Sequence, residues 1–345
     1  MTQAIDHWRA LALQTRCDAI NGLSLDEARA SMRATIERVG RQIRAAKGFI
    51  GSDTRLVVLP EYFLTSFPFG EGLAGWRTLA AIEQDGVEYE LLGEIAQANA
   101  VYIAGNAYEC DPAFPTLYFQ TSFVLNDSGD VVLRYRRLQS LFAPGPYDVW
   151  SHYLDVYGAD AIFPVADTPL GRLAAIASEE ILYPEIARAL ALRGAEVFVH
   201  STSEVGSPAL TPKDIAKRAR AFENNAYLVS ANSAGIANHD IPESSTDGMS
   251  KVVDWQGVVI AEAGFGESMV ANAELDMAGL RRWRRRPGMQ NMLARQRPGM
   301  FAEVYADNDG MDALLHDGEV VVPDRSYFVD SQQARIRKLI DDGII

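Results

Sequence analysis

The chain has 345 residues, 48% of them apolar and 23% charged, which is typical of a folded globular protein. Its formal net charge of −14 argues against nucleic acid or a membrane as a partner, because either would require a strongly basic surface. No apolar run reaches the roughly 18 residues of a membrane helix, and the N-terminus has no apolar signal core. We therefore expect a cytoplasmic protein with enough apolar material for a large α/β core.

Strand-like and helix-like segments alternate through the first half of the chain. Residues 8–15 form a β-rich run, and residues 24–46 are expected to form a helix that begins with a capping box of Ser24 and Glu27. The short apolar run 55–60 is typical of a strand buried on both faces. The next expected elements are a helix at 82–98, a strand at 101–108, and a hairpin of residues 117–125 and 130–135.

The alternation continues in the second half, and no internal repeat is visible in the residues. The expected elements are a strand at 173–177, a helix at 184–193, a strand at 196–200, a helix at 213–226, a strand at 227–231 and a hairpin at 251–262. Hairpins among alternating strands and helices favour mixed sheets, and two of them packed face to face with helices outside would bury the apolar strands. Residues 307–345 are polar and are expected to form a loop-rich tail that packs on a neighbour.

Two of the motifs that carry chemistry lie where strands end. Glu61 follows the strand at 55–60, and a carboxylate there is either a general base or one half of an ion pair. Arg137 closes the first hairpin, where strand alternation places it on the opposite side from Arg136. Arg134 and Arg136 are expected to lie on a solvated basic face.

A third motif lies at a turn from strand to helix. Ser178 follows the apolar strand at 173–177, and Glu179 and Glu180 come directly after it. A side chain at such an elbow is held exposed, with the N–H groups of the following helix close enough to stabilise negative charge. The structural alternative is that Ser178 and Glu179 only cap the helix.

Together these motifs resemble the nitrilase, or carbon–nitrogen hydrolase, superfamily over residues 8–282. Glu61 matches the glutamate of the family's LPE-type motif, and Glu180 matches the glutamate that follows the catalytic cysteine. Arg137 falls at the position of the catalytic lysine, and Ser178 falls at the position of that cysteine. Supporting matches are residues 184–197, residues 218–232 and the sequence Gly248-Met249-Ser250.

The resemblance implies an architecture and an assembly. Residues 1–290 are expected to form a four-layer α-β-β-α sandwich with two mixed sheets. Residues 291–345 are expected to form a C-terminal extension that packs on this domain or on a neighbouring subunit. A homodimer or a larger homo-oligomer is implied as well.

The resemblance also implies a reaction, in which a thiolate attacks an amide or nitrile carbon. A serine hydroxyl is far less acidic than a thiol, and an ordinary carboxylate is a poor base for it. Arg137 keeps a positive charge but cannot transfer a proton as lysine does, and a bidentate pair with Glu61 would keep that carboxylate ionised. We therefore expect a small amide, nitrile or related C–N substrate at a non-thiol site formed by Glu61, Arg137, Ser178 and Glu180.

Two alternatives to such an enzyme stay open. The first is a catalytically inactive homologue that binds a small ligand or acts as a partner subunit. The second, a serine version of the amidase reaction, is disfavoured by the acidity argument. Substrate contacts are expected from Tyr62, Tyr147, Asp148, Trp150, Glu179, His200 and Glu204.

The remaining features favour structural explanations. His152, His200 and His239 lack the spacing of metal ligands, and no metal or organic cofactor is implied. Cys17 and Cys110 are expected to be small buried hydrophobic residues. The basic run from Arg281 to Arg286 indicates a subunit contact or a cluster of salt bridges.

Overall fold

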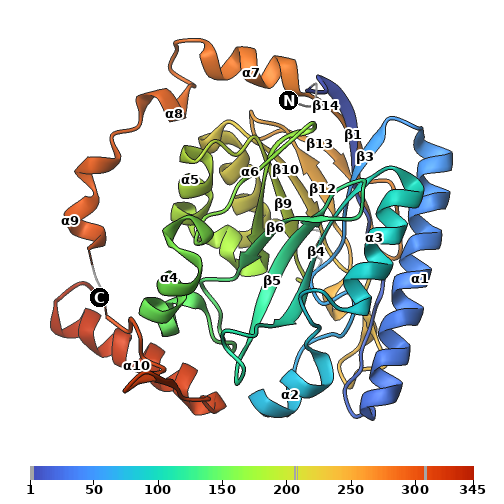
Figure 1. Ribbon diagram of the computed structural model, residues 1–345. Helices are drawn as coiled ribbons and strands as arrows, with labels where there is room; N and C mark the ends of the chain where they lie inside the picture. The colour runs from blue at the N-terminus through green and yellow to red at the C-terminus, as the bar shows by residue number, and fades with distance from the viewer. Residues whose placement is uncertain (1–3, 206, 208, 307–308) are drawn as a thin grey trace.

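The computed structural model describes residues 4–205, 207, 209–306 and 309–345. This part of the chain forms a four-layer α-β-β-α sandwich, as the sequence predicts (Figure 1). Two six-stranded mixed sheets pack against each other, and pairs of helices cover their outer faces. The apolar layer between the sheets is the largest core of the molecule.

The first sheet comes mainly from the N-terminal half and has the order β14-β1-β3-β4-β5-β6. Strands β1, β3 and β4 are parallel, β5 and β6 form an antiparallel hairpin beside β4, and β14 is antiparallel to β1. Helices α1 (Leu25–Ile50) and α3 (Val87–Asn99) cover its outer face. Its strands are β1 (His7–Ala12), β3 (Thr54–Val58), β4 (Tyr102–Cys110), β5 (Tyr118–Leu125), β6 (Val131–Arg136) and β14 (Asn272–Asp276).

The second sheet has the order β13-β12-β10-β9-β8-β7. Strands β8, β9 and β10 are parallel, β12 and β13 form the hairpin beside β10, and β7 is antiparallel to β8. Helices α5 (Pro184–Leu192) and α6 (Pro212–Asn224) cover its outer face. Its strands are β7 (Ala166–Thr168), β8 (Gly171–Ala177), β9 (Val197–Ser201), β10 (Tyr227–Ala231), β12 (Lys251–Val253) and β13 (Val259–Glu262).

The two sheets share one topology, although no repeat is visible in the residues. Each has three parallel strands, a hairpin on one side and a single antiparallel edge strand on the other. The middle parallel strands β3 and β9 therefore correspond to each other. Their carboxyl ends meet in space, where the backbone N–H of Glu61 donates to the carbonyl oxygen of Thr202 at 3.2 Å.

Several expected boundaries move once tertiary contacts are visible. Helix α1 begins with the predicted capping box, in which the Ser24 side chain accepts from the Glu27 N–H and Glu27 accepts from the Ser24 N–H. Helix α3 begins at Val87 rather than at residue 82, because Ile82 pairs with Glu109 at the sheet edge. Strand β1 ends at Ala12 rather than at residue 15.

The expectation that Arg134 and Arg136 lie on a solvated face is wrong. Arg136 is only 5% exposed, pairs with Asp111, and stacks over Tyr157 with its guanidinium carbon 4.3 Å from the ring centroid. Arg134 pairs with the buried carboxylate of Glu109 at 3.2 Å. The outer face of β6 is covered because helix α4 (Trp150–Tyr157) packs over it.

The C-terminal part is more helical than its polar sequence predicts. Helix α10 (Arg325–Asp341) lies where a loop-rich tail was expected, and Asp324 caps it by accepting from the N–H groups of Ser326 and Tyr327. Residues 307 and 308 of that expected tail lie outside the described residues. The chain reaches α10 through α7 (Met277–Arg285), α8 (Met292–Arg295), α9 (Ala302–Tyr305), β15 (Leu315–His316) and β16 (Glu319–Val320).

The basic run from Arg281 to Arg286 forms internal contacts. Arg281 pairs with Glu196 at 2.9 Å, and Arg284 donates to the carbonyl oxygens of Ala195 and Asn225. This supports the salt-bridge interpretation of the run. Within the residues that the structure describes, no helix is both long and apolar enough to cross a bilayer.

Candidate functional site

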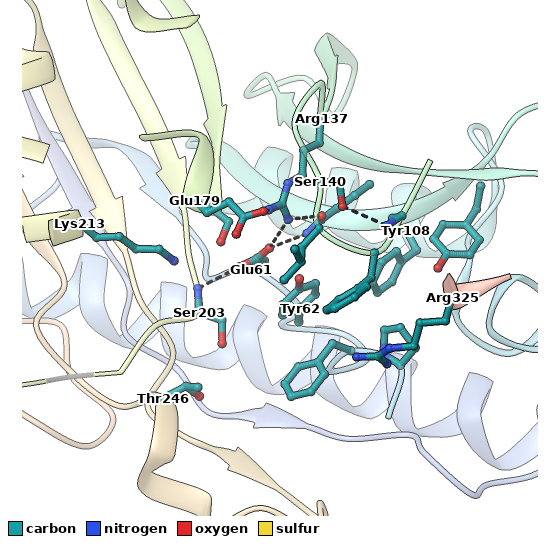
Figure 2. Close-up of a pocket in the computed structure, with 18 residues that line it drawn as sticks. Glu61, Tyr62, Tyr108, Arg137, Ser140, Glu179, Ser203, Lys213, Thr246 and Arg325 are labelled. Atoms are coloured by element: carbon teal, nitrogen blue, oxygen red, sulfur yellow. Dashed lines mark hydrogen bonds and ion pairs between the residues drawn. The ribbon is translucent and has the colours of Figure 1, made fainter. Parts of the chain in front are cut away.

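A cavity of about 250 Å³ lies at the carboxyl ends of β3, β8 and β9, at the small end of the size range of ligand pockets (Figure 2). Its walls also include the loop after β6, the start of α6 and the start of α10. The lining residues are Glu61, Tyr62, Phe67, Pro68, Tyr108, Tyr118, Gln120, Arg137, Ser140, Leu141, Phe142, Ala143, Ser178, Glu179, Ser203, Lys213, Thr246 and Arg325. Five of the residues singled out in the sequence are therefore brought together here: Glu61, Tyr62, Arg137, Ser178 and Glu179.

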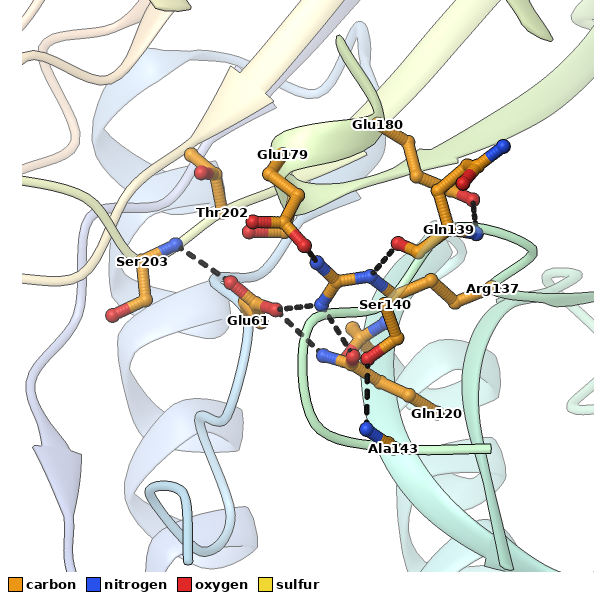
Figure 3. Close-up of polar contacts among 12 residues, drawn as sticks. Glu61, Gln120, Arg137, Gln139, Ser140, Ala143, Glu179, Glu180, Thr202 and Ser203 are labelled. Carbon is orange, nitrogen blue, oxygen red and sulfur yellow. Dashed lines mark hydrogen bonds and ion pairs between the residues drawn. The ribbon is translucent and has the colours of Figure 1, made fainter. Parts of the chain in front are cut away.

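The Glu61 carboxylate is held from two sides at the bottom of this cavity (Figure 3). Oε1 accepts a hydrogen bond from Gln120 Nε2 at 2.6 Å and another from Arg137 Nη1 at 3.3 Å. Oε2 accepts from the backbone N–H of Ser203 at 3.1 Å. The carboxylate is thus fixed in place, with Oε2 less engaged than Oε1.

The Arg137 guanidinium is also fixed, because most of its five N–H groups have partners. Nε donates to the carbonyl oxygen of Gln139 at 2.7 Å, and Nη1 donates to Gln120 Oε1 at 2.6 Å and to Glu61. Nη2 donates to Glu179. The contact with Glu61 involves one carboxylate oxygen and is not the bidentate pair that the sequence suggested. Although burial opposes the charged form, Glu61 and Glu179 raise the pKa of Arg137.

Ser178 lies at the end of β8 in a strained backbone conformation. Its φ of 47° is in the left-handed region, which a residue with a side chain occupies at a cost of about 1–2 kcal/mol. The residue lines the cavity but is only 4% exposed. Within the described part of the chain, its hydroxyl has no hydrogen-bond partner and therefore no base beside it.

The expectation that Ser178 and Glu179 cap the following helix is wrong. Residues Ser178–Leu182 form a 3-10 turn, and α5 begins only after it, at Pro184. Tyr183 is the N-cap residue of α5 and makes no side-chain cap. The elbow is therefore one turn longer than the sequence suggests.

Glu180 and His200 lie behind the cavity rather than in its wall. Glu180 Oε1 accepts from the backbone N–H groups of Leu138 and Gln139 at 2.7 and 2.8 Å, and Oε2 accepts from the Tyr135 hydroxyl at 2.6 Å. Burial raises the pKa of Glu180 from 4.5 to about 7. Its carboxylate thereby fixes the start of the loop that carries Arg137.

His200 holds the backbone of the elbow. Its Nε2 lies 2.8 Å from the carbonyl oxygen of Ser178, and its Nδ1 lies 2.8 Å from the Ser230 hydroxyl. Because a carbonyl only accepts, Nε2 carries the proton and Nδ1 accepts from Ser230. Burial, together with the charge of Lys217, holds the pKa of His200 well below its usual value.

The other sequence-predicted ligand contacts lie outside the lining. Glu204 pairs with the buried ammonium of Lys217. Asp148 accepts from the backbone N–H of Gly145 at 2.8 Å and from the Tyr327 hydroxyl at 2.7 Å, so it joins the loop after β6 to α10. Tyr147 and Trp150 pack against each other, with ring centroids 5.7 Å apart.

Neither cysteine of the chain provides a nucleophile in the cavity wall. The Cys17 thiol lies under Glu61, 3.6 Å from its carbonyl oxygen, and is fully buried. Burial raises the pKa of Cys17 and also that of Cys110. Both therefore stay protonated at neutral pH, as small buried residues should. Among the described residues, His, Cys, Asp and Glu do not gather into a group that could hold a metal.

Sequence reasoning missed four polar residues of the cavity: Gln120, Ser203, Lys213 and Arg325. Gln120 lies in the middle of the first hairpin, and only the register of β5 with β4 and β6 reveals that its side chain reaches Glu61 and Arg137. Ser203 contributes a backbone N–H, which has no signal in a sequence. Arg325 arrives from a segment that was expected to be a tail.

Comparison with known proteins follows from this geometry. The family model described as carbon–nitrogen hydrolase matches residues 22–285, which is more than half of the chain. The chain belongs to the carbon–nitrogen hydrolase family. The match leaves α8, α9 and α10 outside the family region.

Individual relatives within the carbon–nitrogen hydrolase family are distant. The chain is 28% identical to the nitrilase and fragile histidine triad fusion protein NitFhit of Caenorhabditis elegans over 54% of this chain and 42% of that protein. It is 24% identical to omega-amidase NIT3 of Saccharomyces cerevisiae over 65% of this chain and 75% of that enzyme. It is 28% identical to a formamidase of Helicobacter acinonychis over 59% of this chain and 57% of that enzyme. The matched part thus spans less than two thirds of the nematode protein and of the formamidase.

Solved structures of the carbon–nitrogen hydrolase family share the fold. Nit3 of Saccharomyces cerevisiae aligns with a TM-score of 0.62 at 21% identity, over 81% of this chain and 94% of that chain. A carbon–nitrogen hydrolase from Helicobacter pylori G27 aligns with a TM-score of 0.64 at 20% identity, over 88% and 99%. An amidase from Nesterenkonia sp. AN1, which carries the acetamide moiety of fluoroacetamide on its active site cysteine, aligns with a TM-score of 0.61 at 19% identity, over 87% and 97%.

Proposed function

We propose that the protein binds a small primary amide or a related C–N compound beside Glu61 and Arg137, without forming an acyl-enzyme. One observation carries the proposal: a fixed donor and a fixed acceptor lie side by side in the cavity. Four of the five N–H groups of Arg137 are committed within the described residues, which leaves one at Nη2. Oε2 of Glu61 accepts only from Ser203. A primary amide offers a carbonyl acceptor and an NH2 donor, so it satisfies both.

The absence of a covalent step is part of the proposal. We infer that Arg137 and Ser178 occupy the positions at which the family has its lysine and cysteine. Serine attack needs a base within hydrogen-bond reach, and the Ser178 hydroxyl has none among the described residues. The ion pairs of Arg137 with Glu61 and Glu179 also favour the ionised carboxylates, which makes them weak bases for a serine. The amidase, omega-amidase and formamidase relatives support the C–N class of ligand.

A second candidate is hydrolysis by water with Glu61 as general base, and the free side of Oε2 is the observation that favours it. Glu61 would take a proton from water while the water oxygen attacks the amide carbon. The proton would then pass to the amide nitrogen as the C–N bond breaks, giving a carboxylate and ammonia. Ser178 takes no part in this sequence of steps.

Intact-mass spectrometry and isothermal titration calorimetry with one panel of compounds test these proposals. The panel contains formamide, longer primary amides, nitriles and carbamoyl compounds. We expect binding of at least one amide, no adduct mass, and an affinity at least about tenfold weaker in Glu61→Gln, because a charge-assisted contact is lost. Glu90→Gln, which removes an exposed carboxylate on α3, is the matched control and should bind as the wild type does.

The outcomes separate the candidates. Ammonia release that disappears in Glu61→Gln but persists in Ser178→Ala would establish the water mechanism. An acyl adduct on Ser178 would refute the absence of a covalent step. Silence across the panel, or binding that Glu61→Gln leaves unchanged, would remove the proposed amide site.

A further inference from the structure

Two cations in the cavity wall have no carboxylate partner within the part of the chain that the structure describes. Arg325 is exposed at the mouth, where its guanidinium carbon lies 4.0 Å from the ring centroid of Phe142. Lys213 is half-buried, and its Nζ contacts only the Thr202 hydroxyl at 3.4 Å. Arg137, in contrast, is already neutralised by Glu61 and Glu179. Figure 2 shows Lys213 and Arg325 on opposite sides of Glu61 and Tyr62.

The charge of this wall differs in sign from that of the molecule. Three cations, Arg137, Lys213 and Arg325, face two carboxylates, Glu61 and Glu179, in a chain with a net charge of −14. A concave region of positive charge on an acidic protein attracts small anions and repels cations. The surplus resides on Lys213 and Arg325, because these two have no ion-pair partner among the described residues.

The positions of the two cations are not explained by the helices that carry them. Lys213 lies in the first turn of α6, and Arg325 is the first residue of α10. The N-terminus of a helix carries partial positive charge, so a cation in its first turn is disfavoured by about 0.3–1 kcal/mol. A bound anion would offset this repulsion.

The position of Arg325 is held by several contacts around it. Phe142 supports the flat face of the guanidinium, which leaves the N–H edge available. Asp324 caps the helix, and the Tyr327 hydroxyl donates to Asp148 at 2.7 Å. The ring of Phe328 is buried. The first turn of α10 is therefore anchored where its arginine faces the cavity.

We propose that the ligand carries a carboxylate or a similar anionic group at the end away from its amide, and that Arg325 binds this group at the mouth of the cavity. Lys213 adds to the attraction from the opposite side. The inference rests on the proposed amide site, and it makes the C-terminal extension, which lies outside the family match, a determinant of specificity.

Succinamate and succinamide test this inference, because they have nearly the same shape and differ in one negative charge. Calorimetric titration of the wild type should show at least about tenfold tighter binding of succinamate. Arg325→Gln should lose most of this preference while its affinity for succinamide stays unchanged. Arg337→Gln removes the same charge from an exposed position further along α10 and should keep the preference. Thermal melting of each variant checks that it is folded.

Each contrary result has a distinct meaning. Equal binding of the two compounds by the wild type would overturn the anionic specificity and leave the amide site intact. A preference that survives Arg325→Gln but disappears in Lys213→Gln would move the anion to Lys213 and overturn the role of Arg325. Failure of both compounds to bind, while another amide binds, would refute this ligand class alone. Failure of every amide would remove the proposed function as well.

Discussion

Glu180 is buried behind the cavity and joins the elbow of β8 to the loop that starts at Leu138. Its carboxylate accepts three hydrogen bonds, two from backbone N–H groups and one from Tyr135. In a protonated form, Oε1 keeps both backbone contacts and Oε2–H donates to the tyrosine oxygen. The site can therefore hold either a carboxylate or a neutral acid of the same shape.

The pH dependence of stability follows from the raised pKa of Glu180. Between its ordinary value of 4.5 and its folded value of about 7, the folded protein holds a proton that the unfolded chain has released. The resulting stabilisation is fully present below about 4.5 and is lost as the pH rises through 7. It amounts to on the order of 3 kcal/mol at most.

Two variants isolate this contribution in urea denaturation. Glu180→Gln imitates the neutral acid, so its stability relative to the wild type should increase as the pH rises from 5 to 8. Glu180→Ala leaves the N–H groups of Leu138 and Gln139 without a partner and should lose at least about 1–3 kcal/mol at every pH. A wild-type–Gln difference that is flat with pH would contradict the raised pKa.

Sequence reasoning located the polar centre of the site but not its full wall. Glu61 and Arg137 lie 76 residues apart and meet, because each follows a strand with a readable pattern. The environment of Ser178 was not predictable, because the lack of a base beside its hydroxyl depends on where Gln120 and Arg137 direct the Glu61 carboxylate. Side-chain networks of this kind have no local signal.

The ends of the helices show how local sequence and tertiary contacts divide the stabilisation. Helix α1 is capped by its own residues, Ser24 and Glu27. Helices α5 and α6 end near one another, and Arg284 of α7 donates to the carbonyl oxygens of Ala195 and Asn225 just beyond them. The first cap was predicted from four residues, whereas the second required knowledge of the fold.

The cap of α1 makes a direct prediction. Ser24→Ala removes the side-chain oxygen that accepts from the Glu27 N–H, and it should destabilise the protein by about 1 kcal/mol. Ser31→Ala, in the interior of the same helix, should be neutral or slightly stabilising, because alanine is the better helix former. Chemical denaturation of the two variants checks the difference, and equal stabilities would rule out a contribution from the cap.

Arg284 makes a second prediction at this scale. Arg284→Ala leaves the carbonyl oxygens of Ala195 and Asn225 without their charged donor, so we expect a loss of about 1–3 kcal/mol in the free energy of unfolding. Arg285→Ala removes the neighbouring exposed arginine and serves as the control, with an expected change below about 0.5 kcal/mol. A larger effect at Arg285 than at Arg284 would show that the basic run acts through something other than these caps.

For the whole molecule, the alternation of strands and helices predicted the sandwich, and the shared topology of its sheets emerged only from strand order. Periodicity identifies a buried strand such as β3 but does not specify its neighbours, because hydrogen-bonded pairing is a long-range property. The polar composition of the C-terminal part concealed α10, whose few apolar residues include the buried Phe328. The division of the chain at residue 290 stays a prediction, as do the oligomer and the cellular location.

The attachment of α10 to the sandwich can be tested by hydrogen exchange. Tyr327→Phe removes the bond to Asp148 and should increase amide exchange in α10, while the strands of both sheets keep their protection. Tyr305→Phe removes a hydroxyl that contacts Glu185 at the surface and should leave α10 unchanged. Equal exchange of α10 in the wild type and Tyr327→Phe would show that Phe328 and its neighbours alone hold the helix.

The meeting of β3 and β9 has a consequence for the order of events during synthesis. The carboxyl end of β3 receives its contact with Ser203 only after about 140 further residues have been made, and Arg325 emerges later still. Domains fold as the chain leaves the ribosome, at roughly 5–20 residues per second, so the N-terminal sheet spends several seconds without the second half of its cavity. A nascent chain therefore passes through a long period in which it has a folded sheet and no ligand site, and ligand capture reports that synthesis has proceeded beyond α10.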